Sequence, residues 1–282
     1  MIGEHSIKVS EAEQGLTVID LLAQRLDISR RHAKSMLDAR KILINGRRVW
    51  MARQKLRRGD LIEIIRDPCR DRALIPDLIH RDQHYIIADK PAGMLANGAA
   101  SLEQALRREL RNPALRAAHR LDRDTTGCLL LACNGVAFDA ATQLFRKREI
   151  AKTYRVIVRG RMARGNRSVR TRIDHRSAVS HIKVLSANAV ASYVQVQLET
   201  GRTHQIRRHL EGLGHPVIGD KAYGTGAAVD PRIRQVPRQM LHAHSLAFTS
   251  PLTGQELSVQ SRLPPDFRAT LADLRLADRR SQ

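Results

Sequence analysis

Two carboxylates lie among arginines in the middle of the chain, and this setting limits the chemistry that they could carry out. Asp122 and Asp124 belong to the stretch HRLDRDTTG, residues 119–127. A metal-dependent nuclease could use two carboxylates to hold a divalent cation, but the neighbouring arginines repel a cation and disfavour this use. The simpler alternative is a turn with surface ion pairs, since Asp, Thr and Gly are common in turns.

Other catalytic signatures are missing from the sequence. It contains no G-x-S-x-G nucleophile motif, no P-loop and no dinucleotide-binding fingerprint. The three cysteines lack the spacing of zinc ligands, and we expect Cys128 and Cys133 to be buried strand residues. His242 and His244 have the spacing of two ligands on a strand but lack a third partner, so we expect packing or hydrogen bonding from them. The sequence therefore predicts no metal site.

The chain carries a large positive charge. Its 282 residues include 49 Lys and Arg against 28 Asp and Glu, a formal net charge of +21. Nucleic acid is the partner that fits best, because neutralised phosphates release condensed counterions. An anionic membrane is the second possibility, but no apolar stretch approaches ~18 residues and the N-terminus lacks the layout of a signal peptide. We expect a cytoplasmic protein that binds nucleic acid and no membrane.

The apolar periodicity divides the chain into two domains and a linker. Residues 17–65 show the pattern helix, helix, strand, strand, which predicts a small α+β module over residues 15–66. Asn45 and Gly46 are a tight-turn signal between two of its strands. Residues 67–78 contain two prolines and no periodicity, which predicts a linker.

Basic residues gather in the first module. Asp38 is the only acid between Arg30 and Arg58, whereas a solvated charged face usually mixes both signs. We therefore favour a nucleic-acid-binding surface over an ordinary charged face. The residues that we expect to bind RNA there are Arg30, Arg31, Lys34, Arg47 and Arg48.

Residues 79–282 predict a second α+β domain, built on a mixed, largely antiparallel β-sheet with flanking helices and loops. Apolar runs and alternating patterns predict strands at residues 84–90, 126–133, 151–160, 179–187 and 191–200. Helical spacing predicts helices at residues 101–110, 136–149 and 203–214.

Two stretches of the first module carry a family resemblance. ISRRHAKSMLDARKILINGRRV and the later LRRGDLIEI are similar to the alpha-L RNA-binding module of a ribosomal small-subunit protein, tyrosyl-tRNA synthetases and several RNA-modifying enzymes. The resemblance implies that a basic helix face and the loop after it grip RNA.

HRLDRDTTG resembles the signature H-R-L-D-x-x-T-S-G of RluA-type pseudouridine synthases. Four more blocks agree in order, and the resemblance covers about residues 80–262: ADKPAGM, KTYRVIV, ETGRTHQIRRHLEGLGHPVIGDKAYG and LHAHSLAFTSPLTG. Thr126 stands where the family usually has serine, Asn97-Gly98 where His-Pro is frequent, and Ser250 where histidine is frequent. These departures bear on the choice of substrate more than on the chemistry.

The resemblance implies that the protein isomerises uridine in RNA to pseudouridine without a cofactor. The N1–C1′ bond breaks, the uracil turns, and it rejoins the sugar through C5. Asp122 is the implied reacting carboxylate, as a nucleophile or a base, and Arg207 is its implied ionic partner. Tyr154 is implied to pack against the base, Arg120 to fill the place of the extruded nucleotide in the RNA stack, and Arg202 to shape the edge of the pocket.

By family habit, we expect a bacterial monomer that acts on ribosomal RNA rather than transfer RNA. The alternative is a non-catalytic RNA-binding or ribosome-assembly factor that keeps the fold, and joint retention of Asp122, Tyr154 and Arg207 favours the enzyme. An RNA methyltransferase is a distant third, because no glycine-rich cofactor loop is present. We expect Asp124 to serve as a local cap or ion-pair partner. Three histidines are further, weaker candidates for a general base: His119, His204 and His209.

Overall fold

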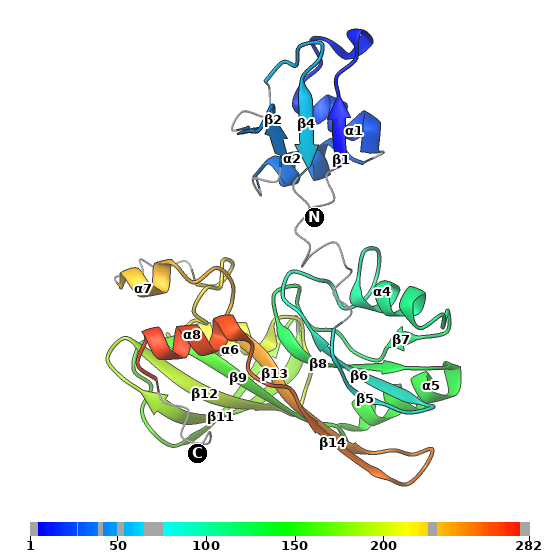
Figure 1. Ribbon diagram of the computed structural model, residues 1–282. Helices are drawn as coiled ribbons and strands as arrows, with labels where there is room; N and C mark the ends of the chain where they lie inside the picture. Colours follow the sequence, from blue (N-terminus) through cyan, green and yellow to red (C-terminus); the bar gives the residue numbers. More distant parts are fainter. Residues whose placement is uncertain are drawn as a thin grey trace. The chain divides into compact units, whose positions relative to one another are not determined.

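The structure is a computed structural model, in which the chain forms two compact units, residues 1–74 and 75–282 (Figure 1). It describes residues 5–26, 28–38, 42–49, 54–64, 76–224 and 230–276. No helix within these ranges is long and apolar enough to cross a membrane.

The smaller unit has a four-stranded antiparallel sheet, in the order β1-β4-β2-β3, and its described residues form two α-helices. The predicted order of two helices followed by strands is confirmed, while the first strand was not predicted. The elements are β1 (His5–Lys8), η1 (Glu11–Glu13), α1 (Val18–Leu26), α2 (Arg30–Asp38), β2 (Ile42–Ile44), β3 (Arg47–Arg48) and β4 (Leu61–Ile64). Asn45 and Gly46 have φ angles of +50° and +74°, as the two-residue turn between β2 and β3 requires.

The larger unit is built on a ten-stranded sheet. Eight strands follow the order β10-β11-β12-β9-β13-β8-β6-β5, β14 pairs with β13, and β7 pairs with β8. Its strands are β5 (Leu78–Arg81), β6 (Tyr85–Lys90), β7 (Arg116–Ala117), β8 (Thr126–Ala132), β9 (Ala151–Arg159), β10 (Asn166–Ile173), β11 (Arg176–Ala187), β12 (Ala191–Leu198), β13 (Leu241–Thr249) and β14 (Glu256–Gln260). Its helices are α4 (Leu102–Glu109), α5 (Gly135–Lys147), α6 (Gln205–Gly212), α7 (Pro231–Arg234) and α8 (Pro265–Asp273).

The predicted fold class, α+β with a mixed and largely antiparallel sheet, is confirmed. Among the strand pairs of the described residues, β8 and β13 alone run parallel. Alternate residues of the strands pack on opposite faces, as in β8, where Leu129 and Leu131 face one core and Cys128 and Leu130 face another. Helices α4 and α6 cover the first of these faces, while α5 and α8 pack on the second.

The described residues of the larger unit form seven elements that the sequence did not predict: β5, β7, β10, β13, β14, α7 and α8. Strand β10 was not predicted, because its buried residues Val169 and Ile173 are four positions apart and its other residues are exposed, which hides the two-residue period. Of the expected linker, residues 67–75 lie outside the described residues, and Leu78 already belongs to β5.

Candidate active site

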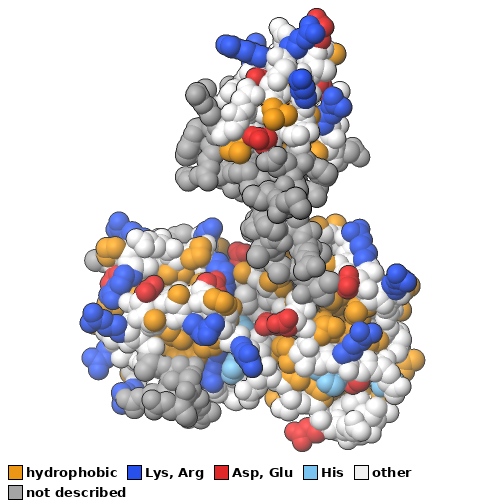
Figure 2. All heavy atoms as spheres, in the orientation of Figure 1, with side chains coloured by type: hydrophobic (Ala, Val, Ile, Leu, Met, Phe, Trp, Pro, Cys, Tyr) orange, Lys and Arg blue, Asp and Glu red, His pale blue; other side chains and the backbone are white. Residues whose placement is uncertain are grey.

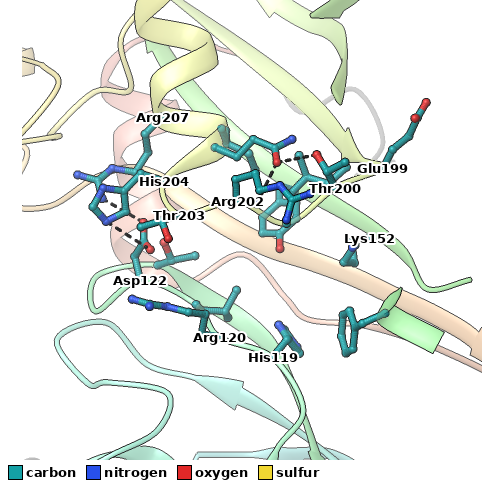
Figure 3. Close-up of a pocket in the computed structure, with 18 of the residues that line it drawn as sticks. His119, Arg120, Asp122, Lys152, Glu199, Thr200, Arg202, Thr203, His204 and Arg207 are labelled. Atoms are coloured by element: carbon teal, nitrogen blue, oxygen red, sulfur yellow. Dashed lines mark hydrogen bonds and ion pairs between the residues drawn. The ribbon is translucent and has the colours of Figure 1, made fainter. Parts of the chain in front are cut away.

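A cavity of about 580 Å³ lies in the larger unit, and several separate parts of the chain line it (Figure 3). These parts are the segment before β8, the end of α5, the start of β9 and the segment that leads into α6. Five residues that the sequence analysis assigned to the site line the cavity together: Arg120, Asp122, Tyr154, Arg202 and Arg207.

Asp122 lies in the turn between β7 and β8, and buried side chains hold the backbone that follows it. Lys90 donates from Nζ to the carbonyl of Arg123 at 2.8 Å. Arg238 donates from Nη1 to the carbonyl of Asp124 at 3.0 Å. The turn therefore has a fixed shape before any substrate arrives.

The strand that continues this turn needs a glycine. Gly127 has a φ of +106°, and a Cβ at this position would collide with the backbone of Ala243 on β13. Beside it, the hydroxyl of Thr126 and Nδ1 of His242 lie 2.9 Å apart. Burial lowers the pKa of His242 to about 4, so the ring is neutral and the contact is a hydrogen bond. The prediction that His242 packs and forms hydrogen bonds is confirmed.

Lys90 is fully buried and donates to three backbone carbonyls. Its Nζ lies 2.8 Å from Pro91, 2.6 Å from Met94 and 2.8 Å from Arg123. Burial lowers the pKa of Lys90 to about 7, against the attraction of the Asp124 charge. One side chain of the ADKPAGM block thus ties the turn of Asp122 to the end of β6.

We predict that Lys90→Met lowers the free energy of unfolding by about 3 kcal/mol, because buried carbonyls lose their donor. Urea denaturation of the variant and of wild type measures the difference. The matched control is Lys147→Met, which removes the charge of an exposed lysine and should leave the midpoint unchanged. Equal midpoints for Lys90→Met and wild type would show that the three hydrogen bonds do not stabilise the fold.

Arg207 connects Asp122 to a second, fully buried carboxylate. Its Nη1 donates to Oδ2 of Asp122 at 3.0 Å, although the two residues are 85 positions apart. Its Nε and Nη2 donate to the two oxygens of Asp220 at 2.6 and 2.8 Å. Burial opposes the charge of Asp220, but this bidentate pair outweighs it and lowers the pKa of the carboxyl. The guanidinium is therefore fixed in orientation before it meets Asp122.

His204 and Tyr223 complete a ring of contacts around this ion pair. Nε2 of His204 lies 3.7 Å from Oδ1 of Asp122, and its Nδ1 lies 3.1 Å from the hydroxyl of Tyr223. The guanidinium of Arg207 lies 4.9 Å from the centroid of the Tyr223 ring. No role for Tyr223 or Asp220 was predicted from the sequence, although both belong to the GDKAYG end of one family block.

Tyr154 lies on β9 and is 8% exposed. Burial raises the pKa of its phenol, and the charge of Asp122 raises it further. The phenol is therefore protonated at neutral pH. It presents an aromatic ring and a hydrogen-bond donor to the same cavity that contains Asp122.

Two of the histidines considered as bases already have structural roles. Nε2 of His119 accepts a hydrogen bond from the backbone of Leu130 at 3.1 Å, and burial lowers the pKa of this ring to about 3. Both ring nitrogens of His209 lie within 3.0 Å of hydroxyls, those of Ser180 and Thr171. These contacts disfavour either ring as a base.

Asp124 was expected to serve as a local cap or ion-pair partner, and its charge attracts the buried ammonium of Lys90. Its carboxylate makes no hydrogen bond and no ion pair with the residues that the structure describes. Its backbone carbonyl, which binds Arg238, is what ties it to the fold.

The residues expected to bind RNA have different surroundings. Arg120 is exposed at the cavity, and Nε of Arg202 donates to the carbonyl of Ser177 at 3.3 Å. In the smaller unit Arg30 is exposed and pairs with Asp20 at 2.7 Å, and Lys34 is exposed. The side chains of three others lie outside the described part of the chain: Arg31, Arg47 and Arg48. On the larger unit, Lys and Arg side chains spread over the visible face with fewer acids between them (Figure 2).

Within the described ranges, no group of three or more His, Cys, Asp or Glu side chains could hold a metal ion. The arrangement instead offers one carboxylate with a fixed guanidinium, an aromatic phenol and a basic rim around one cavity. These parts suit a reaction on a nucleotide in which a carboxylate acts on the sugar.

Comparisons with known proteins agree with this chemistry. Residues 84–212 match the family model of RNA pseudouridylate synthases. Ribosomal large subunit pseudouridine synthase D of Vibrio parahaemolyticus is 32% identical, over 96% of this chain and 94% of its own. The protein of the same name from Pseudomonas aeruginosa is 33% identical, over 71% of this chain and 72% of its own. The solved structure of human RNA Pseudouridylate Synthase Domain Containing 4 has a TM-score of 0.61 and 26% identity, over 73% of this chain and 95% of that one. The chain therefore belongs to the RNA pseudouridylate synthase family, enzymes that isomerise uridine in RNA to pseudouridine.

Proposed function

We propose that this enzyme modifies uridine in the ribosomal RNA of the large subunit, with Asp122 as the reacting carboxylate. The observation that carries the assignment is the chain of contacts from Asp122 through Arg207 to the buried Asp220, beside Tyr154 in one cavity. The choice of RNA is supported by the names of the bacterial relatives, which are called ribosomal large subunit pseudouridine synthases.

The proposed reaction conserves every atom of the uridine. The N1–C1′ bond breaks, a C5–C1′ bond forms, and the proton that leaves C5 is balanced by one that N1 gains. Asp122 acts on the sugar, as a nucleophile or as a base, while the uracil is detached. Arg207 donates to Oδ2 of the carboxylate, and Oδ1, which lies 3.7 Å from Nε2 of His204, is the oxygen that faces the sugar in this proposal.

Tyr154 supplies the surface against which the uracil packs and turns. Its ring is largely buried, so the base excludes the remaining water when it enters. Its protonated phenol is a donor within the cavity and can take part in the proton movement at C5.

A uridine must leave the RNA stack to reach this cavity, which costs a few kcal/mol. We assign Arg120 to the place that the uridine leaves, since its side chain is exposed at the cavity beside Asp122. Arg202 shapes the opposite edge. Further affinity comes from the smaller unit, which we assign as an alpha-L RNA-binding module with Arg30, Arg31, Lys34, Arg47 and Arg48 as phosphate contacts.

We expect the protein to work as a monomer in the cytoplasm. Asp122, Tyr154 and Arg207, the residues of the proposed reaction, line one cavity of this chain.

Purified protein, incubated with RNA from cells that lack its gene, tests the substrate. We expect new pseudouridine at one or a few positions of large-subunit ribosomal RNA and none in transfer RNA. Single-nucleotide pseudouridine mapping measures both. New pseudouridine confined to transfer RNA would contradict the proposed substrate and leave the activity intact.

A further inference from the structure

The cavity extends beyond the residues that the proposed reaction uses. Figure 3 shows Lys152 and Glu199 on the opposite side of the cavity from Asp122. The charged residues that line this second end are Arg146, Arg148, Lys152 and Glu199.

The charges of the cavity lining do not balance. Its cations are Arg120, Arg146, Arg148, Lys152, Arg202 and Arg207, whereas its carboxylates are Asp122 and Glu199. Both carboxylates already have partners: Asp122 binds Arg207 at 3.0 Å, and Glu199 lies 2.6 Å from Nε2 of His181 and 4.0 Å from Nη1 of Arg148. The second end of the cavity therefore has one carboxylate, Glu199, for three cations, Arg146, Arg148 and Lys152.

Lys152 is the least exposed of these three cations. Its side chain is partly buried, and its ammonium makes no hydrogen bond or ion pair with any residue in the described ranges. Burial lowers the pKa of Lys152, and the charge of Arg148 lowers it further. A partly desolvated cation beside a second cation is unfavourable unless an anion joins them.

Interactions at the end of α5 account for only some of the cations at the second end of the cavity. Arg146 and Arg148 lie at the carboxyl end of the helix, where cations interact favourably with the helix dipole. The stem of Lys152 packs near Phe145, with Nζ 5.4 Å from the ring centroid. Neither interaction supplies a hydrogen-bond acceptor for the ammonium inside the cavity.

We propose that Lys152, with Arg148 beside it, binds an RNA phosphate attached to the uridine that enters the cavity. Lys152 and Tyr154 are two residues apart on β9 and face the same cavity, so they are about 7 Å apart along the strand. A nucleotide with its sugar at Asp122 and its base at Tyr154 carries a phosphate on each side of the sugar, and in the proposed complex one of them lies at Lys152. The inference rests on the proposed function, since it takes the cavity as the site of the uridine.

Binding of small ligands to the full-length protein, followed by NMR titration, tests this subsite without turnover. The probes are uridine, uridine 5′-monophosphate, uridine 3′-monophosphate and inorganic phosphate. We expect one of the monophosphates to bind roughly tenfold more tightly than uridine, as one charge-assisted hydrogen bond provides. Lys152→Met should remove this preference and leave uridine binding unchanged, while Lys152→Arg should retain most of it.

The matched control is Lys147→Met, which removes the same charge from an exposed position of α5 that does not line the cavity. It should keep the preference. The phosphate contact would be contradicted if Lys152→Met and Lys147→Met weakened monophosphate binding equally. It would also be contradicted if Lys152→Met weakened the binding of uridine and of both monophosphates by the same factor. If inorganic phosphate bound through Lys152 as tightly as either monophosphate, the site would be one for a free anion. This result would contradict the proposal that the bound phosphate belongs to RNA.

The inactive variant Asp122→Asn separates this inference from the proposed function. It should keep the preference for a monophosphate, because it changes only the other end of the cavity. If the wild-type protein bound a monophosphate more tightly than uridine but formed pseudouridine in no RNA, the proposed function alone would be contradicted. If the protein formed pseudouridine but bound uridine and both monophosphates equally tightly, the phosphate subsite alone would be contradicted.

Discussion

Asp122→Asn removes pseudouridine formation, with a rate at least about a thousandfold below that of wild type. Asn is nearly isosteric and its carbonyl oxygen can still accept the hydrogen bond from Arg207. An amide is a poor nucleophile and a poor base, so the substitution removes the reacting group and leaves the fold intact. Release of isotope from C5-labelled uridine in RNA measures the rate, with RNA binding and thermal melting measured in parallel.

Asp124→Asn is the matched control, two positions away in the same turn. The Asp124 carboxylate makes no hydrogen bond or ion pair among the described residues, and its backbone carbonyl is unchanged by the substitution. We therefore expect most of the activity to remain. Equal loss in the two variants would mean that the turn, and not the Asp122 carboxylate, is what the reaction requires.

Arg207→Ala lowers activity by at least about a hundredfold, and it also destabilises the protein. The buried Asp220 loses both of its guanidinium hydrogen bonds, and removal of one partner of a buried ion pair costs about 3–5 kcal/mol. Loss of activity in this variant alone would therefore mix folding with chemistry.

A second variant separates the two effects. Arg207→Met combined with Asp220→Asn removes the charge from both members of the buried pair, so Asp220 no longer remains as an uncompensated buried carboxylate. We expect urea denaturation to show recovery of much of the lost stability, while turnover stays low and RNA affinity stays near that of wild type. Recovery of activity together with stability would show that Arg207 acts only as part of the fold.

The sequence allowed the turn of Asp122 and the strand of Tyr154 to be found, because each lies in a short block with local signals. HRLDRDTTG precedes an apolar run that forms the buried strand β8. The strand pattern of AKTYRVIV predicts β9. Local pattern and family resemblance agree at both places, which is why these residues could be named before the fold was known.

The environment of these residues could not be predicted from local pattern. In the sequence, Lys90 is an ordinary lysine at the end of a predicted strand. In the structure it is fully buried and donates hydrogen bonds to three backbone carbonyls. Asp220 reads as a loop carboxylate, yet its role depends on Arg207, 13 positions earlier and on a helix. Such contacts arise from the packing of elements that are distant in sequence, and hydrophobic periodicity does not predict them.

The smaller unit shows the same division between local and distant signals. The turn at Asn45 and Gly46 follows from the residues that favour positive φ angles. Strand β1 has only four residues and exists because it pairs with β4, more than fifty positions later. A short strand of this kind lacks a local signal of its own.

The central claim is that the chain modifies large-subunit ribosomal RNA through the Asp122 carboxylate. The most direct measurement is pseudouridine mapping of total RNA from cells in which the gene is deleted and then restored as wild type, Asp122→Asn or Asp124→Asn. We expect one or a few large-subunit positions to lose pseudouridine on deletion, to regain it with wild type and Asp124→Asn, and to stay unmodified with Asp122→Asn at equal protein level. Restoration by Asp122→Asn, or a map that deletion does not change, would contradict the claim.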